Sequence, residues 1–151
     1  MEQLVVFVLD EQDYALPLNN VVRVIHAVEI KTLPKAPEII PGIINVKGQI
    51  IPVVDVRKRF GLISREIIPD DQLIIADTGK RQIALMIDHV IGIKKITSLQ
   101  LINTKETLPF AGYIKGVVTI EDELILIYDL EQFLNLNEEL ELEQALEKKT
   151  I

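Results

Sequence analysis

Short runs of apolar and β-branched residues, each bounded by polar turn signals, recur along the whole chain. The first run, residues 4–9, is followed by the polar stretch 10–13 and by a second run at 14–18, which is typical of a β-hairpin. Further pairs of runs occupy residues 42–54, 72–87 and 116–128. Because few segments show the longer period of an amphipathic helix, the pattern predicts a mainly β protein, either a barrel or a sandwich.

The order of these runs occurs twice. Residues 4–22 align without a gap on 73–91, and residues 42–56 align without a gap on 116–130, so the two offsets are 69 and 74 positions. Few matched residues are identical, and any β protein of this composition aligns with itself to some degree, so chance similarity is the alternative. A real repeat would give each half about five strands, near the size at which a core is marginal alone. We therefore expect the halves to pack together and to leave a groove at their junction.

Polar residues at matched positions predict how the strands end. Asp55 and its match Asp129 precede short segments suited to a helical turn, and Asn19 and its match Asp88 are suited to cap a helix. Residues 131–151 are rich in Glu and contain two lysines close to the end. Cations are favoured at a helix C-terminus, so this segment predicts a charged C-terminal helix or tail.

Composition and charge exclude several classes of function. The 151 residues include no Cys, which excludes disulfides, thiolate nucleophiles and Cys-ligated metals. The net charge of −7 argues against binding to nucleic acid. The chain opens without the basic region of a signal peptide, and no apolar stretch approaches the roughly 20 residues of a membrane helix. We therefore expect a cytoplasmic protein that does not insert into the membrane.

The sequence carries no recognisable catalytic, cofactor or metal site. His26 and His89 have no second imidazole at metal-binding spacing, and the adjacent carboxylates Asp70 and Asp71 are expected in a solvated turn. Neither of the two serines lies in a nucleophile elbow, and the glycines form no phosphate-binding loop. Catalysis by scattered residues, or a small-ligand sensor, remains the alternative class. A deep apolar pocket with converging polar groups would favour that alternative.

The charges are distributed unevenly along the chain. Residues 19–67 hold eight basic and four acidic side chains, whereas residues 121–147 hold ten acidic side chains and no basic one. Such a dipolar surface suits the orientation of a partner, although solvated faces would explain it too. Within the basic region, three prolines in 34–41 predict a rigid, extended loop. Its Ile39 and Ile40 either contact a partner or cover one end of a barrel.

One stretch of the chain resembles a known family. The sequence contains Leu33-Pro34-x-x-Pro37, then Gly42-x-x-Asn45-x-Lys47-Gly48, an apolar strand with Pro52, and Asp55-Val56-Arg57. This set is similar to the signature of CheW-like domains, and the resemblance covers roughly residues 4–136. It implies two SH3-like five-stranded β-barrels related by a pseudo-twofold axis, within a single domain. On this basis subdomain 1 spans about 14–68 and subdomain 2 about 72–130, with strand 4–9 exchanged between the barrels.

The resemblance also implies a function. CheW-like proteins are non-catalytic adaptors that couple chemoreceptors to a CheA-type histidine kinase in bacterial chemosensory signalling. They bind the kinase regulatory domain through barrel ends and the receptor's cytoplasmic tip in the groove between barrels, so recruitment to membrane receptor arrays is expected. The implied partner-binding residues are Val21, Arg23, Gly42, Asn45, Lys47 and Gly48. An adaptor of a divergent array, with pilus, gliding or second-messenger output, is an alternative.

At one point the chain departs from the family pattern. The family often has Glu near Arg23 and Arg near Lys47, which form an ion pair. This chain has a basic residue at both positions. We expect Arg23 and Lys47 to lie close together, so that a carboxylate of a partner can bind between them.

Overall fold

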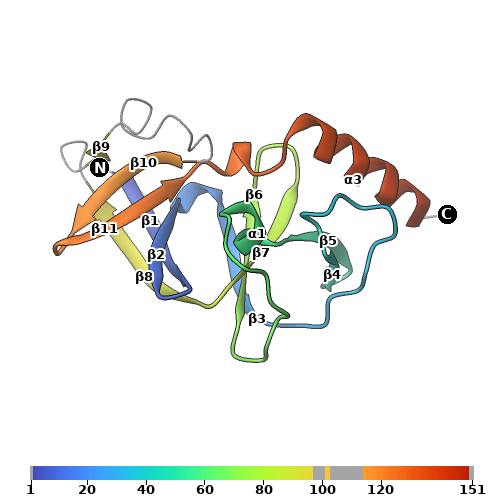
Figure 1. Ribbon diagram of the computed structural model, residues 1–151, viewed down its shortest axis with the longest axis horizontal. Helices are drawn as coiled ribbons and strands as arrows, with labels where there is room; N and C mark the ends of the chain where they lie inside the picture. Colours follow the sequence, from blue (N-terminus) through green and yellow to red (C-terminus); the bar gives the residue numbers. More distant parts are fainter. Residues whose placement is uncertain (1, 97–100, 103–113, 150–151) are drawn as a thin grey trace.

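The computed structural model describes residues 2–96, 101–102 and 114–149, and it shows two β-sheets side by side with the C-terminal helix over one of them (Figure 1). Sheet A has the strand order β8 (His89–Ile96), β1 (Glu2–Leu9), β2 (Gln12–Pro17), β11 (Glu123–Tyr128), β10 (Ile114–Ile120) and β9 (Leu101–Ile102). Sheet B has the order β3 (Val21–His26), β6 (Gln72–Asp77), β7 (Gln82–Ile87), β5 (Gln49–Val54) and β4 (Gly42–Val46). The mainly β prediction is confirmed, and sheet A differs from the expected five strands only by the two-residue β9.

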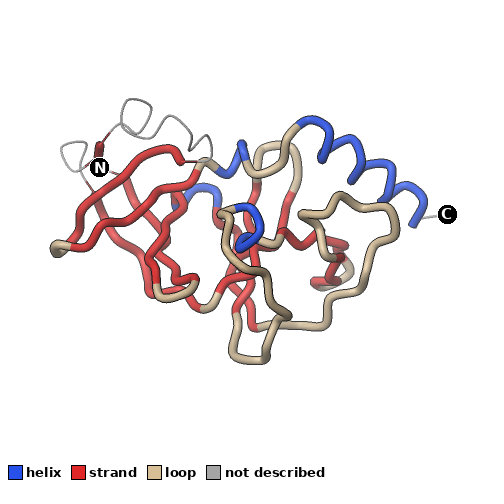
Figure 2. Tube along the Cα trace, viewed as in Figure 1, coloured by secondary structure: helices blue, strands red, loops and turns tan. Residues whose placement is uncertain are grey.

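The helices lie in connections and at the C-terminus (Figure 2). They are η1 (Leu18–Asn20), α1 (Val56–Arg59), η3 (Leu130–Gln132) and α3 (Leu136–Lys149). Asp55 caps α1 by accepting a hydrogen bond from the Lys58 amide, and Asp129 caps η3 through the Glu131 amide, as predicted. Asn19 and Asp88 are not caps, because η1 has no side-chain cap and strand β8 follows Asp88. No described helix has the length and apolarity needed to cross a bilayer.

The internal repeat is confirmed by the strand pairing. Leu4 pairs with Pro17 in the first hairpin and Leu73 pairs with Met86 in the second, which reproduces the offset of 69. Gly42 pairs with Val53, and Gly116 pairs with Ile127, which reproduces the offset of 74. Even the irregularities match: the pairing of β3 with β6 skips Val22, and the pairing of β8 with β1 skips Ile91. Chance self-similarity does not produce the same register and bulge twice.

The two halves exchange their first hairpins. Hairpin β1–β2 lies in sheet A, where β2 pairs in parallel with β11 from the end of the chain. Hairpin β6–β7 lies in sheet B, where β7 pairs in parallel with β5 from the first half. Each sheet therefore contains strands from both halves.

Three apolar clusters hold the fold together. Within sheet A one cluster contains Leu4, Ala15, Val118, Ile125 and Ile127, and in sheet B their matches Leu73, Ala84, Ile44, Ile51 and Val53 form the second cluster. The third and largest cluster lies between the sheets and joins the opposite faces of β1, β2, β6 and β7. It also takes in Leu142 and Ala145 of α3, so the C-terminal helix is part of the shared core. Neither half buries this central surface by itself.

Candidate functional site

The turn between β4 and β5 carries three of the predicted partner-binding residues. Lys47 and Gly48 have φ angles of 51° and 86°, and two positive φ angles are typical of a type I′ hairpin turn. The side chain of Asn45 fixes this turn, because its Oδ1 accepts a hydrogen bond from the Gly48 amide at 2.8 Å. Asn45 and Gly48 therefore shape the turn, and Lys47 is left exposed at its tip.

Arg23 and Lys47 line the same small pocket, as the sequence predicted. The pocket has a volume of about 110 Å³ and is also lined by Val22, Val46, Gln49, Ile51, Ile75 and Gln82. Within the described part of the chain, no carboxylate forms an ion pair with either cation. Two positive charges across a small pocket attract an anionic group.

Val21 and Gly42 lie elsewhere and serve the fold. Val21 is half-buried at the start of β3 and packs against the central cluster. Gly42 is buried in β4, beneath the connection that leads from β3. A Cβ atom at this position would lie 2.2 Å from the carbonyl oxygen of Lys31, so no side chain fits. The structure therefore brings Arg23, Asn45, Lys47 and Gly48 to one surface, but not Val21 or Gly42.

Exposed apolar residues, which sequence reasoning missed, form matched pairs on the two sheets. They are Val22 with Ile91, Val24 with Ile93, and Ile50 with Leu124, at offsets of 69, 69 and 74. All six side chains are between 38% and 56% exposed. Solvent exposure of large aliphatic side chains is ordinary when they are scattered, but the same positions recur here in both halves. The repeat therefore places exposed aliphatic side chains at the same positions of both sheets.

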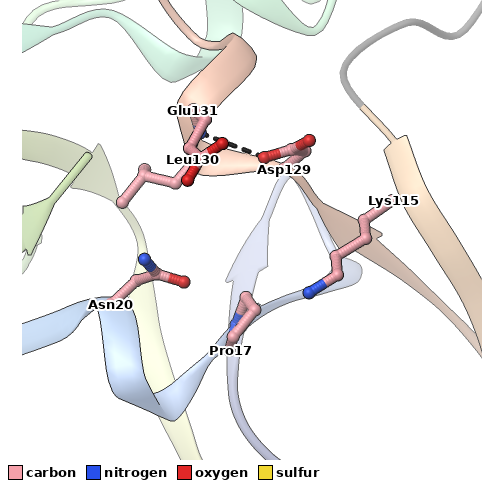
Figure 3. Close-up of a pocket in the computed structure, with 6 residues that line it drawn as sticks. All are labelled: Pro17, Asn20, Lys115, Asp129, Leu130 and Glu131. Atoms are coloured by element: carbon pink, nitrogen blue, oxygen red, sulfur yellow. Dashed lines mark hydrogen bonds between the residues drawn. The ribbon is translucent and has the colours of Figure 1, made fainter. Parts of the chain in front are cut away.

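Two pockets lie at matched positions of the repeat, and the first of them adjoins connections between the sheets, where a groove was expected. The first has a volume of about 180 Å³ and is lined by Pro17, Asn20, Lys115, Asp129, Leu130 and Glu131 (Figure 3). The second, of about 600 Å³, is lined by Glu29, Ile30, Pro41, Asp55, Ser64, Arg65, Glu66, Ile67 and Met86. The repeat relates them, because Pro17 matches Met86 and Asp129 matches Asp55. The lysine of the first pocket, Lys115, is replaced by Pro41 in the second.

Asp71 is buried in an ion pair, so the predicted solvated turn is wrong at this residue. Its two oxygens accept hydrogen bonds from Arg65 at 2.7 and 2.8 Å, and the Ile68 amide donates a third at 2.9 Å. Burial raises the pKa of the Asp71 carboxyl, but these hydrogen bonds outweigh it and hold the pKa below its usual value. The neighbouring Asp70 is exposed, as predicted.

The proline loop covers the core. Ile39 and Ile40 are both 4% exposed and belong to the central cluster, and the Ile39 carbonyl accepts a hydrogen bond from the Asp55 amide at 2.9 Å. Of the two roles left open for these residues, the structure supports the covering one. Among the described residues, no group of three or more His, Asp or Glu is placed to hold a metal ion.

Comparison with known proteins identifies similar chains. A family model described as the CheW-like domain matches residues 3–138. Chemotaxis protein CheW from Thermotoga maritima is 33% identical over 128 residues, which cover 85% of this chain and 84% of that protein. Chemotaxis protein CheW from Helicobacter pylori is 22% identical over 133 residues, or 87% of this chain and 81% of that protein. The crystal structure of the scaffolding protein TtCheW from Thermoanaerobacter tengcongensis matches with a TM-score of 0.81 at 31% identity, covering 91% of this chain and 94% of that chain.

Proposed function

The chain belongs to the CheW-like domain family, and from this premise we propose that it is a non-catalytic adaptor coupling chemoreceptors to a CheA-type histidine kinase. The observation that carries the proposal is the family match over residues 3–138, together with the likeness to a scaffolding protein at a TM-score of 0.81. The protein acts in the cytoplasm and is recruited to membrane receptor arrays.

The kinase regulatory domain, itself CheW-like, binds at the exposed apolar surfaces. Val22, Val24 and Ile50 are the apolar residues exposed at matched positions on sheet B, and Ile91, Ile93 and Leu124 are their matches on sheet A. Two separate surfaces allow one adaptor to contact two neighbours at once, which is what a scaffold requires. Side chains of this type supply the apolar centre of a protein interface when polar residues surround them.

The cationic pocket selects an acidic partner. Arg23 and Lys47 bind a Glu or Asp from the receptor tip or the kinase, because a carboxylate placed between two cations forms charge-assisted hydrogen bonds with both. Asn45 and Gly48 act by shaping the turn that presents Lys47, while Val21 and Gly42 hold the strands behind it. The receptor tip binds at the junction of the two sheets, beside the pocket that Pro17, Lys115 and Asp129 line.

The two cations also favour a divergent array as the second candidate. The internal ion pair that is frequent in the family cannot form between Arg23 and Lys47, so the pocket requires its counter-ion from outside. A receptor or kinase from an array with pilus, gliding or second-messenger output would then carry the matching carboxylate.

Calorimetry with the CheA-type regulatory domain from the same cell tests the proposal. We expect binding at about micromolar affinity, which corresponds to roughly −8 kcal/mol. A regulatory domain from an unrelated array serves as the control for specificity. Absence of binding heat with every kinase regulatory domain and receptor tip from the source cell would contradict the adaptor role.

A further inference from the structure

Arg57 connects the two sheets through a buried guanidinium. It lies in α1, directly after strand β5 of sheet B, and its side chain is 4% exposed. Its Nε and Nη2 atoms donate to Oδ1 of Asp10 at 3.1 and 2.9 Å, and Nη2 also donates to Oδ1 of Asp88. Asp10 forms the turn between β1 and β2 of sheet A. The guanidinium of α1, next to sheet B, therefore hydrogen-bonds to a turn of sheet A.

Asp88 completes this connection from the segment that links the sheets, between β7 of sheet B and β8 of sheet A. Its Oδ2 accepts a hydrogen bond from the Asp10 amide at 3.0 Å, and its own amide donates to the carbonyl of Val8 at 3.0 Å. Arg65 donates to Asp88 at 2.9 Å and is itself held by Asp71. Side chains from both sheets and from the connection thus share one network.

The network occurs on one side of the repeat only. The position that matches Arg57 at offset 74 is Glu131, and the positions that match Asp10 and Asp88 at offset 69 are Gly79 and Asn19. None of the three charges is therefore reproduced on the other side of the junction, although the strands and their registers are. The network is consequently a feature of this junction and not a by-product of the duplicated fold.

The apolar contacts and the Arg57 hydrogen bonds between the sheets differ in how strongly they depend on direction. The central cluster between the sheets is apolar, and apolar burial stabilises contact without fixing direction. A planar guanidinium donates hydrogen bonds only to acceptors that lie along its N–H bonds. The Arg57 contacts therefore specify the position of their partners as well as their proximity. Buried ion pairs are weak evidence for stability, and their best-attested role is to select one arrangement among several.

We propose that Arg57 is a positioning residue for the scaffold: it fixes the orientation of sheet A relative to sheet B. This rests on the proposed function, in which the two exposed apolar surfaces bind different neighbours. Val22, Val24 and Ile50 lie on one sheet, and Ile91, Ile93 and Leu124 lie on the other, so the angle between the sheets sets the angle between the neighbours. An array needs that angle to be constant.

Distance measurement between the sheets tests the proposal without any partner. The chain has no Cys, so Ile50→Cys and Leu124→Cys introduce two unique spin-label sites at matched, exposed positions. Pulsed electron paramagnetic resonance should give one narrow distance distribution for the native network and a broadened or shifted one for Arg57→Gln. An unchanged distribution in a folded Arg57→Gln protein would overturn the proposal.

Two further variants separate positioning from stability. Arg81→Gln removes the ion pair between Arg81 and Glu139 at 2.9 Å, which joins sheet B to α3 and not to sheet A. We expect it to lower the melting temperature while leaving the distance distribution unchanged; broadening equal to that of Arg57→Gln would contradict the specific role of Arg57. Arg57→Lys keeps the charge without the fork, and it provides the same test should Arg57→Gln fail to fold.

Binding experiments then connect the geometry with function. Arg57→Gln should bind an isolated kinase regulatory domain within about twofold of the native affinity, a factor worth roughly 0.4 kcal/mol. Co-assembly of receptor, kinase and adaptor should fall at least tenfold. Equal losses in both assays would show that Arg57 acts on the binding surfaces themselves. A native protein that binds no kinase domain would refute the adaptor role alone, because the distance measurement stands independently.

Discussion

Lys47 and Glu121 occupy the same position in two repeated hairpins and carry opposite charges. They are matched at offset 74, each begins a two-residue turn, and each has a φ angle of 51°. The same backbone conformation therefore accepts either residue. The charge at this position is free to be selected by a partner, since the turn itself does not require it.

The first prediction concerns Lys47→Glu. Because Glu121 shows that the turn accommodates Glu, the melting temperature should change little. Binding to an acidic partner should weaken about tenfold or more, which is about 1.4 kcal/mol, because one of two attracting cations becomes repulsive. A binding isotherm and a melting curve, recorded for the variant and the native protein, measure the two effects.

Glu121→Lys is the matched control for Lys47→Glu, since it reverses a charge at the same turn geometry on the other sheet. It should leave the affinity for the acidic partner within about twofold. The loss in Lys47→Glu should also shrink in high salt, where exposed charges are screened. Equal affinity of Lys47→Glu and the native protein for the acidic partner would show that Lys47 is not part of the binding surface.

The second prediction concerns the two glycines of the family motif. Gly42→Ala places a Cβ 2.2 Å from the Lys31 carbonyl oxygen, so the strand pairing must shift, and the free energy of unfolding should fall by about 3 kcal/mol. In Gly48→Ala the new Cβ meets no neighbouring atom. Alanine adopts a φ angle of 86° less readily than glycine, however, so the free energy of unfolding should fall by about 1–2 kcal/mol. Urea denaturation of both variants measures the difference, and equal losses would contradict the steric role of Gly42.

The third prediction concerns the turn bond of Asn45. Asn45→Ala removes the acceptor of the Gly48 amide and should lower the free energy of unfolding by about 1 kcal/mol. Asn45→Asp keeps an oxygen in the same place and should remain within a few tenths of a kcal/mol of the native protein. Urea denaturation checks both values. A loss in Asn45→Asp as large as that in Asn45→Ala would mean that the amide group has another role.

The fourth prediction concerns pH. The pKa of Asp71 is lower in the folded protein than its ordinary value of 3.8, so its ionised form stabilises the fold at pH values above about 4. This contribution is lost as the pH falls through the lowered pKa. Asp71→Asn should therefore cost about 2 kcal/mol at pH 7, and its difference from the native protein should shrink towards pH 3.

Urea denaturation at a series of pH values checks the Asp71 prediction. Asp70→Asn is the matched control, because Asp70 is the exposed neighbour in the chain, and it should change the free energy of unfolding by less than about 0.5 kcal/mol at every pH. A difference between Asp71→Asn and the native protein that stays constant with pH would show that the carboxylate charge does not contribute.

Local features of the candidate site were predictable from the sequence. The hairpin containing Lys47 and Gly48 follows from the apolar alternation and the glycine, and Asn45 hydrogen-bonds to the turn as Asn side chains commonly do. Arg23 and Lys47 share a pocket, as the family resemblance implied. These features depend on residues a few positions apart or on a motif with a known arrangement.

Other features were not predictable, because they depend on contacts between distant residues. Asp71 and Asp88 have the sequence surroundings of a surface turn and a helix cap, but Arg65 and Arg57 join them to one partly buried network. Ile39 and Ile40 occur in a polar, proline-containing segment, and only the packed halves show that they are core residues. The apolar pairs match at the two offsets in the sequence, but only the structure shows that these side chains are exposed.

The strands, their turns and the repeat can be read from the chain alone, because alternation and turn residues act within a short window. Which sheet each hairpin joins depends on contacts that form in the folded protein. Hairpins β1–β2 and β6–β7 carry the same apolar pattern at offset 69 and pair in the same register, so either one satisfies the strand pairing of either sheet. Backbone pairing alone therefore does not distinguish the two arrangements. The arrangement is marked instead by contacts present at one junction only, such as that between Arg57 and Asp10, whose partners lie 47 residues apart in the chain.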